Sequence, residues 1–178
     1  IKAGDQLTLE DLLNGLLLYS GNDNAVAIAD HIAGSTEKFA EMMNAEAKKL
    51  MATNSHFVNP SGLHDDNHYT TAYDLYLIFN ECIKHDEFVK IINSSSYTAH
   101  ITGADGTKRD VKWEPTNYYA KGEATPPDNV TIIGGKTGTT KGAGNCLILL
   151  TKDSSGNPYI SIIMGAGSKP LLYQDMTS

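Results

Sequence analysis

The 178-residue sequence has little cysteine, little positive charge and no long apolar run. Its two cysteines, Cys82 and Cys146, each lie in an apolar stretch, so we expect buried free thiols, and their redox state stays open. No apolar run approaches the ~18 residues of a membrane span. Clustered Lys and Arg are missing and the formal net charge is −7, which argues against a nucleic-acid partner. The chain begins with Ile1 and not with Met, which predicts a processed product or a piece of a longer protein.

What the sequence does contain is enough for one core. With 40% hydrophobic residues, it is expected to form a single domain over residues 1–178. Helical periodicity runs from about residue 8 to 93, beginning at a capping box between Thr8 and Asp11. A leucine stripe that should pack into a core follows at Leu9, Leu12, Leu13, Leu16 and Leu17. Short connections between the later strands favour antiparallel pairing, and helices followed by such a sheet, over about 96–167, predict an α+β fold. The expected strands are 97–102, 108–113, 132–140, 146–151 and 159–165.

The densest chemistry lies in residues 132–140, where an apolar strand runs into Lys136. Glycines at positions 134, 135 and 138 leave the backbone bare, so an extended ligand can pair with the strand edge. Lys136 adds a positive charge there, and the hydroxyls of Thr137 and Thr139 can orient an anion or relay a proton. A solvated lysine at a hairpin corner is the plainer interpretation, because three-residue motifs recur by chance.

A second motif, Ser20-Gly21-Asn22, lies in a polar turn between two predicted helices. By itself it is typical of a turn with a helix cap. Together the motifs stand in the order used by penicillin-recognising serine acyl transferases, which is Ser-x-x-Lys, then Ser-x-Asn, then Lys-Thr-Gly. In that chemistry a serine nucleophile needs a lysine base, a second Ser and an Asn connect the base to the substrate, and a strand lysine binds a terminal carboxylate.

Longer stretches extend this similarity over nearly the whole chain. Residues 16–29, 54–65, 69–75 and 134–139 resemble the low-molecular-mass D-alanyl-D-alanine carboxypeptidases, which are serine penicillin-binding proteins of the bacterial cell wall. The resemblance implies a β-lactamase/transpeptidase-like fold, with an antiparallel sheet flanked by helices plus an all-helical region. It also implies that residues 1–178 are a partial catalytic domain.

The resemblance implies a role for each matching residue. Ser20 would relay protons between the lysine base and the leaving D-alanine, and Asn22 would hold the substrate amide carbonyl. Lys136 would bind the terminal carboxylate together with two threonine hydroxyls, and the backbone N–H of Thr139 would form half of the oxyanion hole. The whole substrate-binding stretch would be Lys136, Thr137, Gly138 and Thr139.

One part of the family pattern is absent. The Ser-x-x-Lys should precede Ser20 by several dozen residues, but the chain has only the residues 1–19 before it. The segment from Ser35 to Lys38 satisfies the pattern, yet it follows Ser20 and opens an amphipathic helix, so we interpret Ser35 as a capping serine and Lys38 as solvated. We therefore expect the nucleophile and base to lie outside this chain and the isolated chain to be inactive. The C-terminal helix that the family packs on its sheet is expected to be missing as well.

The resemblance also implies partners and a location. The substrate would be a peptidoglycan stem peptide ending in D-Ala-D-Ala, and β-lactam antibiotics would inhibit the intact parent protein. No cofactor and no nucleic acid are expected. Because this substrate lies outside the cytoplasmic membrane, the parent should be exported to the cell wall or periplasm, with any membrane association made by segments outside this chain.

Three other function classes stay open. A loop rich in metal-binding residue types suggests a zinc peptidase through His56, His64, His68, Asp65 and Asp66. It lacks a zinc-ligand spacing, so we expect no metal site. A β-lactamase-type hydrolase shares both motifs, although its class A form has Asp where Gly21 stands and uses a deacylating Glu. A non-catalytic cell-wall-binding module would fit if the gene began near Ile1.

Overall fold

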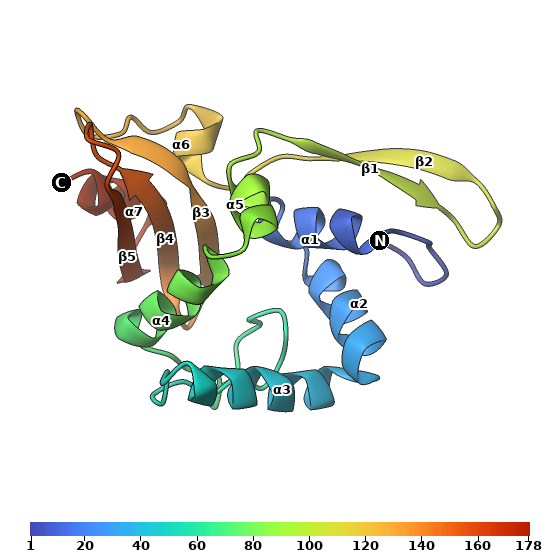
Figure 1. Cartoon of the computed structure of the whole chain (residues 1–178). Helices are drawn as coiled ribbons and strands as arrows, with labels where there is room; N and C mark the ends of the chain where they lie inside the picture. The colour runs from blue at the N-terminus through green and yellow to red at the C-terminus, as the bar shows by residue number, and fades with distance from the viewer.

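The computed structural model describes all of residues 1–178 as seven helices and five strands (Figure 1). The helices are α1 (Leu9–Leu17), α2 (Asn22–Ala33), α3 (Thr36–Lys49), α4 (Ala72–Cys82), α5 (Asp86–Ile92), α6 (Tyr118–Lys121) and α7 (Lys169–Thr177). The strands are β1 (Tyr97–Thr102), β2 (Lys108–Trp113), β3 (Thr131–Thr140), β4 (Gly144–Lys152) and β5 (Pro158–Ala166). None of the helices has the length and apolar character needed to cross a membrane.

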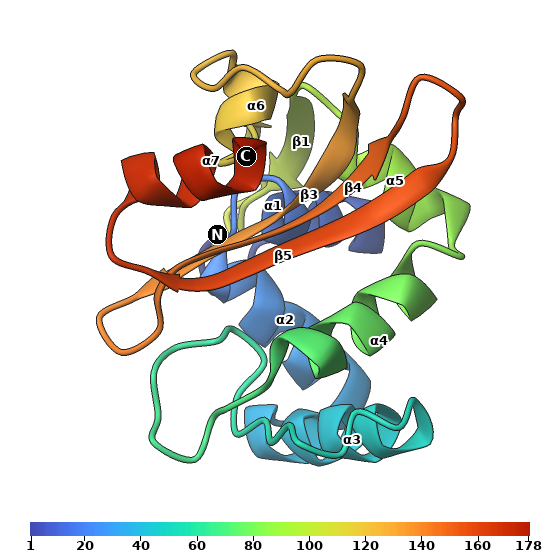
Figure 2. The same ribbon diagram turned by 90° about the vertical axis from the view of Figure 1, so that its left-hand side faces the viewer.

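The strands form two separate antiparallel sheets. β1 and β2 make a hairpin, whereas β3, β4 and β5 form a sheet with β4 in the centre. Successive side chains of β4 point to opposite faces, so Leu149 packs with α7 while Leu150 packs with α4 and α5 (Figure 2). Helices on both faces of an antiparallel sheet confirm the α+β prediction.

The leucine stripe of α1 does not become core, and that prediction is wrong. Leu9 is 55% exposed and the other four leucines are half-buried. The buried residues of α1 are instead Asp11, Asn14 and Gly15.

The predicted capping box is present, and Asp11 also accepts a hydrogen bond of 2.9 Å from the Tyr97 hydroxyl. Burial and this bond raise the pKa of Tyr97 to about 12. A Cβ on Gly15 would lie 2.2 Å from Asn24 Nδ2, so α1 packs tightly on α2 through its polar face.

The C-terminal helix is present, contrary to expectation. Ser168 caps α7 by accepting a hydrogen bond from the Leu171 N–H, and Leu172 and Tyr173 are buried against the sheet. The sequence signals this helix weakly, because its apolar residues Leu171, Leu172 and Tyr173 are consecutive and do not form a clear helical stripe.

The two cysteines are free, as expected, but only half-buried. Cys82 lies at the end of α4, and Cys146 lies on β4 opposite Gly138. Burial raises the pKa of the Cys82 thiol, which keeps it protonated and unreactive at neutral pH.

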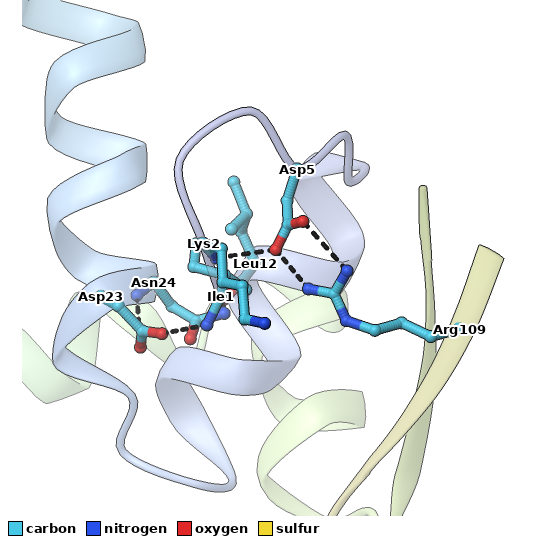
Figure 3. A network of polar contacts seen from close by, with 7 residues as sticks. All are labelled: Ile1, Lys2, Asp5, Leu12, Asp23, Asn24 and Arg109. Atoms are coloured by element: carbon cyan, nitrogen blue, oxygen red, sulfur yellow. Dashed lines mark hydrogen bonds and ion pairs between the residues drawn. The ribbon is translucent and has the colours of Figure 1, made fainter. Parts of the chain in front are cut away.

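Polar contacts fasten the N-terminal segment to the α1–α2 junction and to β2 (Figure 3). Arg109 on β2 donates from both terminal nitrogens to the carboxylate of Asp5, a fork-to-fork pair. The Asp23 carboxylate contacts the main-chain nitrogen of Ile1 and accepts from the N–H of Asn24 at 3.0 Å. Through Asn24, whose amide donates to the carbonyl of Leu12 at 3.4 Å, the network holds the two helices that flank the Ser20 turn.

The long loop between α3 and α4 is anchored by one buried carboxylate. Asp74 is completely buried at the start of α4. Its Oδ2 accepts the N–H of Asn54 and the hydroxyl of Ser55, both at 2.7 Å. The loop ends, bridged at His56 and Tyr69, are therefore pinned to the helix that packs on the sheet.

We expect Asp74→Ala to lower the free energy of unfolding by about 3 kcal/mol, because two buried donors lose a charged acceptor. Urea unfolding followed by circular dichroism measures the change. Asp74→Asn is the matched control, since its amide keeps one acceptor oxygen and should cost less. An Asp74→Ala chain as stable as the parent chain would contradict this account of the loop.

Candidate functional site

The site is built on the open edge of β3. β3 is an edge strand of the three-stranded sheet, so β4 pairs with it on one side only. A Cβ on Gly135 would lie 2.0 Å from the carbonyl oxygen of Ile148, so only glycine allows the close approach of β4 here. At Gly138, by contrast, a Cβ would meet nothing nearer than 4.0 Å, which leaves this stretch of exposed strand without bulk on it.

Lys136 reaches across from this strand to Ser20. Its Nζ donates to Ser20 Oγ at 2.6 Å and to the carbonyl oxygen of Thr137 at 2.6 Å. Burial lowers the pKa of Lys136 to about 8, because an ammonium removed from water is costly to keep charged. A lysine with this pKa can hold an anion at neutral pH and can also exchange a proton with a neighbouring hydroxyl.

Ser20 is held in a constrained turn between α1 and α2. Its φ is +64°, a left-handed conformation that few residues other than glycine adopt. Backbone hydrogen bonds fix the turn on both sides, from Gly21 N–H to the Gly15 carbonyl at 3.0 Å and from Thr116 N–H to the Leu18 carbonyl at 3.2 Å. The hydroxyl is therefore presented toward β3 by the backbone itself.

Of the other predicted site residues, the two threonines lie beside the cavity, whereas Asn22 makes no hydrogen bond with Lys136. Thr137 and Thr139 lie on β3 beside the cavity that also contains Ser20, and Thr137 Oγ1 is 2.5 Å from Thr116 Oγ1. Asn22 is exposed at the first turn of α2 and makes no side-chain hydrogen bond, so the structure does not join it to Lys136. Its amide is free to bind a ligand.

The cavity at this site has a volume of about 220 Å³. Its wall includes six residues that sequence reasoning missed: Thr116, Tyr118, Cys146, Lys169, Leu172 and Tyr173. Tyr118 stacks on Tyr173 with ring centroids 4.6 Å apart, so two distant segments make a rigid aromatic wall. No local pattern signals this wall, because it comes from tertiary packing of α6 and α7 beside β3.

Ser35 is a capping residue, as predicted. Its Oγ accepts a hydrogen bond of 3.2 Å from the N–H of Lys38, and the lysine side chain is exposed. α3, which Ser35 begins, lies away from β3 in both views (Figures 1 and 2). The pair is therefore not part of this site.

The histidines of the long loop are occupied by local contacts. His56 Nδ1 lies 2.6 Å from the carbonyl of Asn67, and His68 Nδ1 accepts from the N–H of Val58 at 3.2 Å. A Cβ on Gly142 would lie 2.5 Å from the His64 ring, so this loop rests on the β3–β4 turn. No group of three or more His, Cys, Asp and Glu side chains in residues 1–178 is arranged to hold a metal ion.

Comparison with known proteins points to one family. The chain is 31% identical over 173 residues to the D-alanyl-D-alanine carboxypeptidase DacF of Bacillus subtilis and 35% identical over 170 residues to DacD of Escherichia coli. Each alignment covers 94% of this chain and 40% of the relative. The crystal structure of the Streptomyces K15 DD-transpeptidase superposes with a TM-score of 0.89 at 30% identity, covering 99% of this chain and 68% of that one.

The chain thus spans about 40% of the length of the curated relatives it matches. The superposition confirms the transpeptidase-like fold that the resemblance implied. Residues 1–168 match the D-alanyl-D-alanine carboxypeptidase family, and the chain belongs to that family.

Proposed function

We propose that this chain forms the substrate-holding side of a serine-type D-Ala-D-Ala carboxypeptidase, which removes the terminal D-alanine from peptidoglycan stem peptides. One observation carries the proposal: Lys136 Nζ contacts Ser20 Oγ at 2.6 Å beside an open strand edge. The contact joins the Ser-x-Asn and Lys-Thr-Gly motifs into a single site, which a chance pair of short motifs would not do.

The substrate peptide binds as an extended strand along β3. Its terminal carboxylate lies against Lys136 and the hydroxyls of Thr137 and Thr139, where charge-assisted hydrogen bonds are strongest. The backbone N–H of Thr139 supplies half of the oxyanion hole. Asn22 donates to the amide carbonyl of the peptide.

The reaction passes through an acyl-enzyme. A serine oxygen attacks the carbonyl carbon of the penultimate D-alanine and gives its proton to the lysine base. Ser20 relays that proton to the leaving amine as the C–N bond breaks. Water then hydrolyses the ester and restores the serine. The nucleophile and its lysine base belong to a Ser-x-x-Lys other than the one at Ser35, whose hydroxyl serves the α3 cap.

Partners and location follow from the same proposal. The intact parent protein binds β-lactam antibiotics as mimics of the D-Ala-D-Ala terminus, and it works outside the cytoplasm, in the cell wall or periplasm, where that peptide is found. It needs no cofactor, because a serine, a lysine and an oxyanion hole suffice for acyl transfer.

Incubation of the 178-residue chain with a fluorescent penicillin should leave no covalent adduct, since neither Ser20 nor Ser35 is a nucleophile. Intact-protein mass spectrometry measures the result. The full-length parent protein is the positive control and should be acylated, with slow release. An adduct mapped to Ser20 or Ser35 would contradict the assigned roles, and fast turnover by the parent would favour a β-lactamase.

Binding of an N-acetylated peptide ending in D-Ala-D-Ala should weaken about tenfold as the pH rises from 7 to 9. The pKa of Lys136 is lowered to about 8, so its positive charge is present below that pH and lost above it. NMR titration at several pH values measures the affinity. In Lys136→Gln the affinity for the peptide should no longer fall near pH 8. If the affinity of that variant keeps the same pH dependence, the role of Lys136 is refuted.

A further inference from the structure

A second connection joins the two halves of the site, and it runs through Thr116. This residue lies in the short segment between β2 and α6 and lines the cavity beside Thr137. Its backbone N–H donates to the carbonyl of Leu18 at 3.2 Å, and its Oγ1 lies 2.5 Å from Thr137 Oγ1. Leu18 precedes Ser20 by two residues, and Thr137 directly follows Lys136. This path from the Ser20 turn to β3 therefore runs parallel to the contact that Lys136 makes.

The segment that carries Thr116 is itself held in place. Its two neighbours in the chain, Pro115 and Asn117, are buried, and the proline ring restricts the backbone just before Thr116. The Asn117 side chain caps α6 by accepting a hydrogen bond of 3.0 Å from the N–H of Tyr119. Thr116 is thus a fixed point between the Ser20 turn and β3.

Of the two connections, the one through Thr116 is the stiffer. A lysine side chain is a flexible stem of four methylene groups, so Lys136 can reach Ser20 over a range of separations. A threonine hydroxyl stands on the branched Cβ, whose torsion is restricted, and the other hydrogen bond of this path comes from the backbone. The separation between the Ser20 turn and β3 is therefore determined by Thr116 more than by Lys136.

We propose that Thr116 is a positioning residue for the acyl-transfer site, which holds the Ser20 turn at the distance from β3 that lets Ser20 and Lys136 exchange a proton. This inference rests on the proposed function, because it assumes that these two residues relay a proton during acyl transfer. Without the Thr116 hydroxyl, the turn and the strand move apart, the distance for proton transfer lengthens, and water reaches the lysine ammonium.

Thr116 acts through Thr137. A hydroxyl has a single proton to donate. In the proposed function Thr137 gives its proton to the ligand, so Thr116 is the donor within the pair of threonine hydroxyls. Two hydroxyls in such a chain polarise each other, which strengthens both hydrogen bonds.

Thr177 offers a matched control within the same chain. Its Oγ1 lies 2.7 Å from the Tyr119 hydroxyl, so it also joins two elements, α7 and α6, through a pair of hydroxyls. It is half-buried like Thr116 but does not line the cavity. Thr177→Val therefore removes a comparable hydrogen bond and leaves the site untouched.

The first measurement is the pKa of Lys136 in the 178-residue chain, followed by NMR of the lysine ε-carbons. It should be about 8 in the unsubstituted chain, because burial disfavours the ammonium. In Thr116→Val it should rise toward the ordinary lysine value of 10.5, because water reaches the ammonium. It should stay at about 8 in Thr116→Ser, which keeps the hydroxyl, and in Thr177→Val.

The second measurement is the rate of acylation of the full-length parent protein at saturating fluorescent penicillin. Thr116→Val should lower this rate about tenfold, because a misplaced proton relay weakens catalysis by at least that factor. Thr116→Ser should restore the rate, and Thr177→Val should leave it unchanged. Thr116→Ala, which places no methyl group beside Thr137, should act as Thr116→Val does.

The outcomes separate this inference from the proposed function. If the unsubstituted parent is acylated but Thr116→Val and Thr116→Ala change neither quantity, the role of Thr116 is wrong while the proposed function stands. The role is also wrong if only one of the two quantities changes, or if Thr116→Ser or Thr177→Val has the same effect as Thr116→Val. If the unsubstituted parent is not acylated, the proposed function fails and the inference falls with it. Thermal unfolding of each variant confirms the fold.

Discussion

The hydrogen bond from Lys136 to Ser20 joins the helical part of the chain to the sheet at the one place where both present functional groups. It connects an edge strand with a helix junction 116 residues away, and each partner is fixed before they meet. The serine is set by its left-handed backbone, and the lysine by a strand that Gly135 lets lie close to β4. Because both side chains are already held in place, the protein loses little conformational entropy when a ligand binds.

Burial and charge act together in this arrangement. The desolvation that lowers the pKa of Lys136 also strengthens the interactions of its ammonium, because fewer waters compete with its two protein partners, the Ser20 hydroxyl and the Thr137 carbonyl. The aromatic wall of Tyr118 and Tyr173 adds to this effect on the α7 side. The cavity is thus a place where a small anion is bound by few, well-placed groups and where a change of one charge is felt strongly.

Strands were predictable because they depend on local rules. Alternating residues and turn signals placed β1 and β2 at their observed bounds and the other three strands within two residues of them. The leucine stripe of α1 correctly predicted a helix but wrongly predicted that its leucines are buried. Periodicity reveals an apolar face of a helix and not which part of the protein covers that face. The pairing of Ser20 with Lys136 was accessible only through the resemblance, because no local pattern links residues so far apart. Lys169 and Tyr118 had no signal at all, since α6 and α7 become a wall only through tertiary packing.

The open edge of β3 has a consequence for how the molecule behaves in concentrated solution. β3 pairs with a neighbouring strand on one side only, so another copy of the same strand can compete with a peptide for its outer edge. Two features oppose such self-association. The irregular register between Ile132 and Gly134 bends the strand, and the charge of Lys136 repels its own copy. At pH values where Lys136 is neutral, its charge no longer opposes pairing of this edge with a second copy.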